Sequence, residues 1–375
     1  MLIGTLNATE STISNLGLFA LSALLGIANV LLVARFIKNK RINNIHLTII
    51  TISFIFVLIS IIGMLDNIST NGLINILQYS LCIGFVVFLS VIRWDTLKIK
   101  IIGNLASLFI LIQFVIWAST SFQSQFSSIY SNSNLITPYM LFMMFFVFML
   151  IQNVSNKSFY YFIILLGFSL MLGSGARAAM FAGILSLITY IFWNFISKNK
   201  FRFLFYFLIV IFGLMMFIFV YPQLPYWKYF PYFENLMLEY TGKSIMSGRD
   251  DIWRPVIAAI NEQPWFGYGP GTLPIDVTGI DLSTHNLYLQ IALQNGYLGL
   301  LVFIILLLYF WIIFYRNLKD KTVRLVASFF IAILIHQSFE IALTQNQLSI
   351  GLMQWFIISV GISQVMYLNE NHRPQ

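Results

Sequence analysis

The chain has 375 residues, of which 59% are hydrophobic, 17% aromatic and 9% charged, and its net charge is +8. A soluble domain carries about 25% charged residues, so this composition excludes a soluble enzyme, a nucleic-acid binder and a disordered chain. It predicts an all-α polytopic membrane protein that forms one integral domain over residues 1–375. The single cysteine, Cys82, allows no intramolecular disulfide and gives no basis for a cysteine-based metal site.

Membrane spans are predicted from apolar runs of roughly 17–25 residues, which are long enough to cross the hydrocarbon core as helices. The runs are continuous, whereas the strands of a membrane barrel alternate between apolar and polar residues. The fifth and sixth runs are short and only a few polar residues separate them. About eleven runs qualify: residues 15–36, 45–65, 72–92, 99–119, 137–153, 158–173, 177–197, 203–221, 296–315, 323–343 and 348–367.

Loop charges predict the orientation of these spans. If alternate loops lie on the cytoplasmic side, that side collects 16 of the 21 Lys and Arg residues. Cytoplasmic loops are enriched in Lys and Arg, so the N-terminus is predicted outside and the C-terminus inside. The other side then holds five basic and ten acidic residues. The net positive charge therefore reflects topology and does not indicate an acidic partner.

The segment between the eighth and ninth spans, residues 222–295, is predicted to be an external loop that contains short helices. A loop of this length without a span of its own is usually functional. Ser247 can cap a helix that has Asp250 in its first turn, and Pro255 predicts a kink or a later start. The glycines of residues 267–271 predict a turn with positive φ angles.

A second short helix is predicted over residues 284–300, with Ser283 or Thr284 as its cap and an Asn-Gly pair closing it. This helix would hold His285 in its first turn, where the helix N-terminus disfavours the imidazolium. The ring would then stay neutral and able to accept a proton. The structural alternative is that a histidine near a helix start serves only as a cap.

Ionisable residues also fall in the tenth span. His336 and Glu340 lie one helical turn apart and share a face, and Gln337 lies beside them. Ionisable residues within a membrane are candidates for function by default, although hydrogen bonding between helices is the structural alternative. Glu340, near the external end of the span, is therefore a further candidate base.

Three sequence blocks together resemble the O-antigen ligase and O-antigen polymerase family of bacterial envelope enzymes. The likeness runs from about the sixth span to the ninth, roughly half of the chain. The third block has the most specific spacing, a His-Asn pair followed after nine residues by Gly-x-x-Gly. The blocks are residues 173–179 (GSGARAA), residues 248–253 (GRDDIW) leading to 264–269 (PWFGYG), and residues 285–286 (HN) leading to 296–299 (GYLG).

The resemblance implies a fold similar to that of class C glycosyltransferases and a reaction that needs neither metal nor nucleotide. Family members bind undecaprenyl diphosphate-linked glycans on the external (periplasmic) face of the inner membrane and transfer the glycan to an acceptor hydroxyl. Carried onto this sequence, the resemblance implies that Arg177 and Arg249 contact the diphosphate and that His285 assists the acceptor. Further candidate substrate-binding residues lie close to these positions in the sequence: Arg254, Asn286 and Tyr268.

The leading interpretation is polymerisation of undecaprenyl diphosphate-linked repeat units into an O-antigen or capsule-type polysaccharide, by metal-independent inverting transfer. The family also contains ligases, which transfer the glycan to lipid A–core, and the motifs do not separate the two. An alternative of another class is a flippase or transporter of lipid-linked oligosaccharides, which predicts inverted repeats and broken helices. The expected partners are the lipid-linked donor and acceptor, membrane lipids and a chain-length regulator, without nucleic acid or cofactor.

Overall fold

The structure is a computed structural model that describes residues 1–10, 12–39, 42–65, 68–242 and 244–371. Within these ranges the regular secondary structure is helical and contains no strand, which confirms the predicted all-α fold. The helices that coincide with predicted spans are α1 (Ile13–Asn39), α2 (Asn44–Gly63), α3 (Thr70–Ser90), α4 (Thr96–Ser119), α5 (Ile136–Ile151), α6 (Ser158–Ser174), α7 (Arg177–Ile191), α9 (Lys200–Val220), α13 (Leu287–Phe314), α14 (Lys321–His336) and α15 (Leu348–Asn371).

Every predicted span overlaps one of these helices, and the fifth and sixth spans are two separate helices. The seventh and tenth spans were predicted too long, because α7 ends at Ile191 and α14 ends at His336. Eight helices of the described residues are long and apolar enough to cross a membrane. α6 and α7 are apolar but shorter, with 17 and 15 residues, and α14 has 16. The chain is thus a polytopic membrane protein, and the number of eleven crossings stays a prediction.

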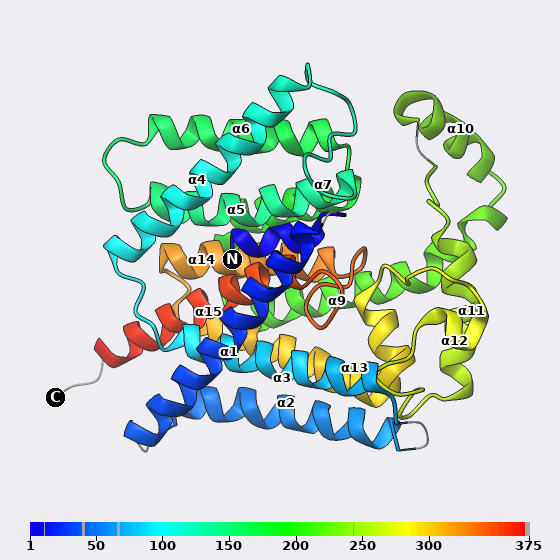
Figure 1. The fold of residues 1–375 in the computed structure, drawn as a ribbon, viewed down its shortest axis with the longest axis horizontal. Coiled ribbons are helices and arrows are strands. Elements are labelled where there is room, and N and C mark those ends of the chain that lie inside the picture. Colours follow the sequence, from blue (N-terminus) through cyan, green and yellow to red (C-terminus); the bar gives the residue numbers. More distant parts are fainter. Residues whose placement is uncertain (11, 40–41, 66–67, 243, 372–375) are drawn as a thin grey trace.

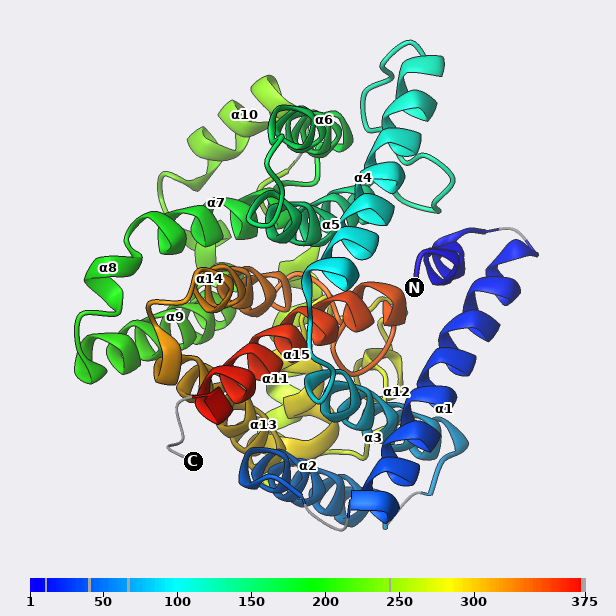
Figure 2. The ribbon, with the colours of Figure 1, turned by 90° about the vertical axis from the view of Figure 1, so that its left-hand side faces the viewer.

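Three helices form the interior of the bundle. α5, α14 and α15 bury nearly all of their side chains, and Figure 2 shows α14 and α15 between α7 and α9 on one side and α2 and α3 on the other. The outer helices instead expose large apolar side chains such as Phe19, Phe168 and Phe212. An exposed apolar surface of this extent indicates contact with a membrane.

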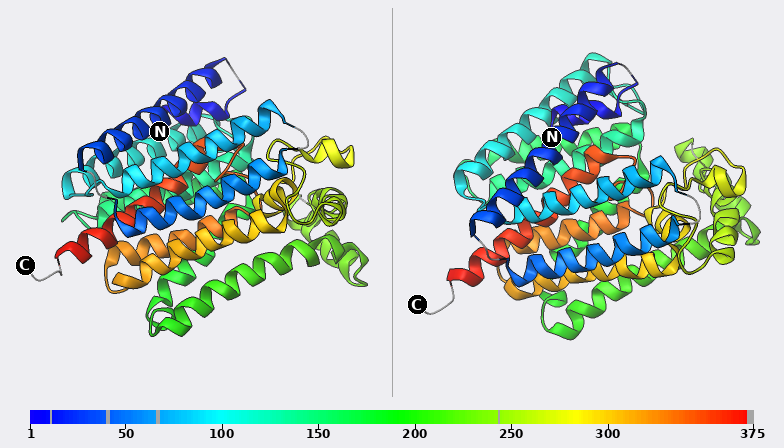
Figure 3. Two further views of the ribbon diagram at one scale, coloured as in Figure 1. Left: turned by 90° about the horizontal axis from the view of Figure 1, so that it is seen from below. Right: turned by 60° about the horizontal axis from the view of Figure 1, so that its bottom comes forward.

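The predicted external loop forms short helices that gather at one end of the bundle, away from the C-terminus (Figures 1 and 3). Its last part confirms the predicted short helix, which forms the first part of α13 over residues 287–295 and ends at a kink at Gly296, before the helix of the ninth span. The side chains of this stretch are buried in the bundle, so it is not a surface loop. The elements between α9 and α13 are η3 (Tyr221–Tyr226), α10 (Phe230–Thr241), α11 (Arg249–Glu262) and α12 (Pro274–Thr278).

α11 starts differently from the prediction. Gly248, with φ +71°, is its N-cap, and no side chain caps the helix. Ser247 is therefore not the cap, and its hydroxyl donates to the Ser244 carbonyl at 3.2 Å. The helix continues through Pro255 to Glu262. The helix buries one apolar face, which includes Ile252, Trp253, Val256 and Ile260.

A contact that we call the backbone clasp fastens the loop to α13, between residues 264–269 and 293–297. α13 is kinked at Gly296, where φ is +64° and ψ is −172°, and the facing turn has the predicted positive φ at Gly267 and Gly269. Three hydrogen bonds form the clasp: Tyr268 N to Leu293 O (2.9 Å), Gly269 N to Gln294 O (2.9 Å) and Tyr297 N to Pro264 O (2.7 Å). The clasp joins parts of the second and third sequence blocks.

Candidate functional site

Four residues predicted from the sequence line one cavity of about 640 Å³: Arg177, Arg249, His285 and Glu340. Small-molecule sites typically measure about 300–1,000 Å³. The walls come from the segment before α5, the start of α7, the end of α9, the turn before α11, and the segments that precede α13 and follow α14. The cavity therefore exists only in the folded chain, where it brings together all three sequence blocks.

Arg177 is the first residue of α7, at a helix N-terminus that faces the cavity. The N-cap, Ala176, makes no side-chain cap, and the first turn contains no acidic residue. Ala178 and Ala179 of the same turn also line the cavity. Because the first N–H groups of a helix have no partner within the helix and carry partial positive charge, this terminus favours an anion.

The guanidinium of Arg177 contacts the turn before α11. Its Nη2 donates to the Ser244 carbonyl at 2.7 Å and to the Ser247 hydroxyl at 3.3 Å. The phenol of Tyr221 holds this turn in place by donating to the carbonyls of Ile245 (2.6 Å) and Met246 (2.7 Å). Arg177 is thus positioned by neutral oxygens.

Arg249 is likewise the first residue of its helix, α11. Its Nη2 donates to the Phe339 carbonyl at 3.3 Å, and its guanidinium carbon lies 5.2 Å from the centroid of the Phe339 ring. In the described residues, neither Arg177 nor Arg249 forms a salt bridge with a carboxylate. Both guanidinium groups can therefore exchange a neutral acceptor for an anionic one without first breaking an ion pair.

His285 and Glu340 form a pair in the cavity wall, with 3.4 Å between Nδ1 of the histidine and Oε2 of the glutamate. Their side chains are 45% and 22% exposed, so a ligand in the cavity can reach them. Nδ1 faces the carboxylate, and Nε2 has no hydrogen-bond partner among the described residues. This arrangement suits a histidine that accepts a proton at Nε2 while the carboxylate orients its ring.

The local structure around His285 corrects the sequence prediction. α13 begins at Leu287 and its N-cap is Asn286, which accepts from the Leu289 N–H, so neither Ser283 nor Thr284 is the cap. His285 precedes the helix and has a φ of +45°. Its expected place in the first turn is therefore wrong, and the argument from the helix N-terminus does not apply to its ring. A positive φ at a non-glycine residue is uncommon and is often found at functional sites.

Glu340 lies beyond the helix in which it was predicted, because α14 ends at His336. The Glu340 N–H still donates to the His336 carbonyl at 3.0 Å, so the two residues stay close. His336 also lines the cavity, but it is 1% exposed and its Nδ1 lies 3.1 Å from Nε2 of Gln354. Gln337 donates to Oε1 of the same Gln354. These contacts favour the structural role for His336 and Gln337.

Arg254 and Tyr268, predicted to bind substrate, do not line the cavity. Arg254 pairs with Asp250 one turn earlier in α11, at 3.3 Å, and donates to the Tyr226 hydroxyl. The Tyr268 hydroxyl donates to the Ala259 carbonyl at 3.1 Å and lies 3.2 Å from a carboxylate oxygen of Glu262. Burial and this neighbouring carboxylate raise the pKa of the Tyr268 phenol. Both residues therefore stabilise the loop between α9 and α13.

Asn286 is fully buried and also lies outside the cavity lining. Its Oδ1 accepts from the Leu289 N–H at 3.0 Å, and its Nδ2 donates to the Ser338 carbonyl at 3.1 Å. Asn286 thus caps α13 and ties it to the segment that carries Glu340. Its contacts therefore hold the backbone segments that carry His285 and Glu340 next to each other.

The cavity also contains residues that the sequence prediction missed: Gln125, Asn132, Ser133 and Asn134. They precede α5 in a segment without any charged residue, so a search for ionisable groups passes over them. The available signal was the run of Ser, Asn and Gln in residues 120–134. Such a run marks a polar loop but does not indicate which side of it faces a ligand.

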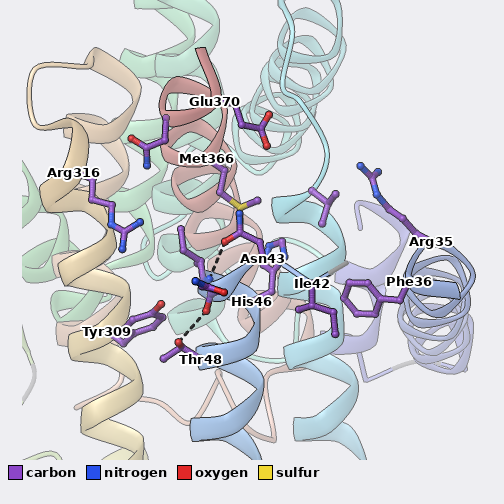
Figure 4. A pocket seen from close by; sticks show the side chains of 14 residues that line it. Arg35, Phe36, Ile42, Asn43, His46, Thr48, Tyr309, Arg316, Met366 and Glu370 are labelled. Carbon is purple, nitrogen blue, oxygen red and sulfur yellow. Dashed lines mark hydrogen bonds between the residues drawn. The ribbon is translucent and has the colours of Figure 1, made fainter. Parts of the chain in front are cut away.

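A second cavity of about 650 Å³ lies at the other end of the bundle and contains none of the three blocks. Figure 4 shows Arg35, His46, Arg316 and Glu370 around it. All four lie on the predicted cytoplasmic side, whereas the first cavity is lined by segments predicted to be external. Segments predicted to lie on the same side of the membrane therefore lie at the same end of the bundle, as an alternating topology requires. Which end faces the cytoplasm stays a prediction.

The fold and the first cavity together define a class of protein: a helical membrane protein in which two arginines without a described carboxylate partner and a histidine–carboxylate pair line one cavity. Residues 162–304 match the model of the O-antigen ligase family. This confirms the resemblance found in the sequence and covers Arg177, Arg249 and His285. Glu340 and the segment before α5 lie outside the matched region.

One curated relative extends this finding. The ComP-specific O-oligosaccharyltransferase of Acinetobacter baylyi is 29% identical over 142 residues, which are 34% of this chain and 26% of the relative. The match thus spans about a quarter of the relative's length.

Proposed function

We propose that this protein transfers a glycan from a polyprenyl diphosphate to an acceptor hydroxyl, and that it acts as a polymerase of undecaprenyl diphosphate-linked repeat units. The observation that carries the proposal is the convergence of Arg177, Arg249 and the His285–Glu340 pair on one cavity. The family match and the oligosaccharyltransferase relative support the same class of reaction. The proposed location is the inner membrane, with the cavity on the external face and the C-terminus in the cytoplasm.

The two arginines would stabilise the leaving group, which is the lipid diphosphate. The bond that breaks joins the anomeric carbon to a phosphate oxygen, and its electrons stay on the diphosphate. Positive groups that are fixed before the reaction stabilise this developing charge. Arg177 and Arg249 supply two such groups, and the uncapped N-terminus of α7 adds partial positive charge.

The histidine–carboxylate pair would remove the proton of the acceptor hydroxyl. As the acceptor oxygen bonds to the anomeric carbon, its proton must leave, and Nε2 of His285 accepts it in the proposed mechanism. Glu340 stabilises the imidazolium that forms, because its carboxylate lies 3.4 Å from Nδ1. General-base catalysis of this kind typically contributes about 10²–10⁴-fold to a rate. Attack from the face opposite the diphosphate inverts the configuration of the sugar.

A ligase is the second candidate, favoured by the description of the matched family as O-antigen ligase. The two candidates share the donor and differ in the acceptor, which is another lipid-linked repeat for a polymerase and lipid A–core for a ligase. The experiment supplies purified lipid-linked repeat to the full-length protein, alone and together with lipid A–core. Elongation of the repeat by itself supports the polymerase, and transfer that requires lipid A–core supports the ligase. Absence of both transfers contradicts the proposal.

Arg249→Ala and Arg249→Lys test the role of the arginines. Both are expected to abolish transfer, because an ammonium cannot reproduce the two-pronged contact of a guanidinium with phosphate. Arg254→Ala is the matched control, since it removes an arginine of the same helix that pairs with Asp250 outside the cavity. In cells, the Arg249 variants should leave repeat units on the external leaflet. Units trapped inside would instead favour a transporter.

A further inference from the structure

We propose that the segment before α5 forms a sugar-binding wall of the cavity, made of Gln125, Asn132, Ser133 and Asn134, which contacts the sugar next to the donor diphosphate. This inference rests on the proposed function and names the part of its substrate that this wall recognises. All four residues line the cavity. The wall is neutral, whereas the charged groups of the cavity lie on other segments.

The chemistry of the wall fits a sugar better than a phosphate. Carboxamides and hydroxyls both donate and accept hydrogen bonds, and so do the hydroxyl groups of a sugar ring. A diphosphate only accepts at neutral pH, and the arginines already provide donors for it. A site built to hydrogen-bond a hydroxyl also rejects analogues that lack it, so this wall would select the sugar.

The amide groups are available for a ligand. The side chains of Gln125 and Asn134 have no hydrogen-bond partner in the described part of the chain, and both are exposed. Asn132 uses only its Oδ1, which accepts from the Asn134 N–H at 2.8 Å. Its Nδ2 therefore stays free to donate.

The wall is fixed beside Arg177, on the side where the donor diphosphate would lie. The Phe126 N–H donates to the Gly173 carbonyl at 3.1 Å, and the hydroxyl of Thr137 contacts that of Ser174. The first contact ties the wall, and the second ties the start of α5 that follows it, to the residues just before Arg177. A sugar linked to a diphosphate that Arg177 holds would thus meet this wall.

Buried aromatic residues keep the wall in place. Phe126 and Tyr130 are 3% and 4% exposed, and the ring of Tyr130 lies 4.8 Å from that of Tyr139 in α5. Trp117, at the end of α4, donates to the Gln123 carbonyl at 2.9 Å. None of these three anchors lines the cavity, so the packing that holds the segment is separate from the residues that line it.

The test compares two probes in detergent: undecaprenyl diphosphate, and lipid-linked glycan extracted from the cells that make this protein. Gln125→Ala and Asn134→Ala are each expected to lower the affinity for the glycan-bearing lipid by about three- to tenfold, the loss of one hydrogen bond. Their affinity for undecaprenyl diphosphate should not change. Gln123→Ala is the matched control, because this exposed side chain of the same segment does not line the cavity.

Each result separates the inference from the proposed function. Unchanged affinity of both variants for the glycan-bearing lipid, or an equal loss for the two probes, overturns the sugar-binding wall. Arg177→Ala should weaken both probes alike, since it removes a contact to the diphosphate. If the unaltered protein binds neither probe, the proposed function itself fails, and the inference fails with it.

Discussion

Gly296→Ala tests the backbone clasp, which holds the loop against α13. The native φ of +64° and ψ of −172° fall in a region that only glycine adopts readily, at a cost of about 1–3 kcal/mol for another residue. An added Cβ would also lie 2.2 Å from the Trp265 carbonyl oxygen. Since this neighbour is backbone, it cannot rotate away, and overpacking costs about 1–3 kcal/mol more. The expected loss of unfolding free energy is therefore about 2–6 kcal/mol.

The assay is thermal unfolding of the purified full-length protein in detergent, followed by tryptophan fluorescence. Gly213→Ala in α9 is the control, because a Cβ there meets nothing within 4 Å and alanine stabilises a helix by about 1 kcal/mol relative to glycine. Gly296→Ala should unfold at a clearly lower temperature than the native protein, and Gly213→Ala should not. If Gly296→Ala unfolds at the native temperature, the close approach of the two backbones is refuted.

Two further predictions concern the histidine–carboxylate pair and its support. His285→Ala and Glu340→Gln should each lower the transfer rate by about 10²–10⁴-fold, and the double variant should lose little more, because the two residues act as one unit. Rates measured under donor saturation check this, and additive losses would contradict the pairing. Asn286→Ala should lower the unfolding free energy by about 1–3 kcal/mol, since it removes a cap and a buried hydrogen bond. A variant with native stability and lost donor binding would instead support the substrate contact expected from the sequence.

The positions of the helices could be predicted from the sequence because hydropathy alone determines which stretches suit a membrane. Each predicted span overlaps a helix, including the two separated by a short polar stretch, although the tenth span runs past the end of α14. Helix starts were less predictable, because several capping residues often lie together. At residues 283–286, three neighbouring side chains can cap a helix, and the contact of Asn286 with Ser338, far along the chain, favours the last of them.

The candidate site was predictable where charge is rare. The predicted external side has only five basic residues, so Arg177 and Arg249 are prominent among few alternatives. The sequence could not show that Arg254 pairs with Asp250, since that depends on the register of α11. It could not show the proposed sugar-binding wall either, because neutral amides are common in loops and only the fold brings Asn134 and Arg177 into the lining of one cavity.

Arg177 and Arg249 rest against carbonyl and hydroxyl oxygens, without a carboxylate to balance them among the described residues. Under the proposed reaction, the diphosphate gains an ionised oxygen when the sugar leaves. The two arginines then attract the spent lipid carrier more strongly than the loaded donor. We expect each round of transfer to end with the carrier still bound. Release of the carrier into the bilayer, and not bond formation, would then be the rate-limiting step of synthesis.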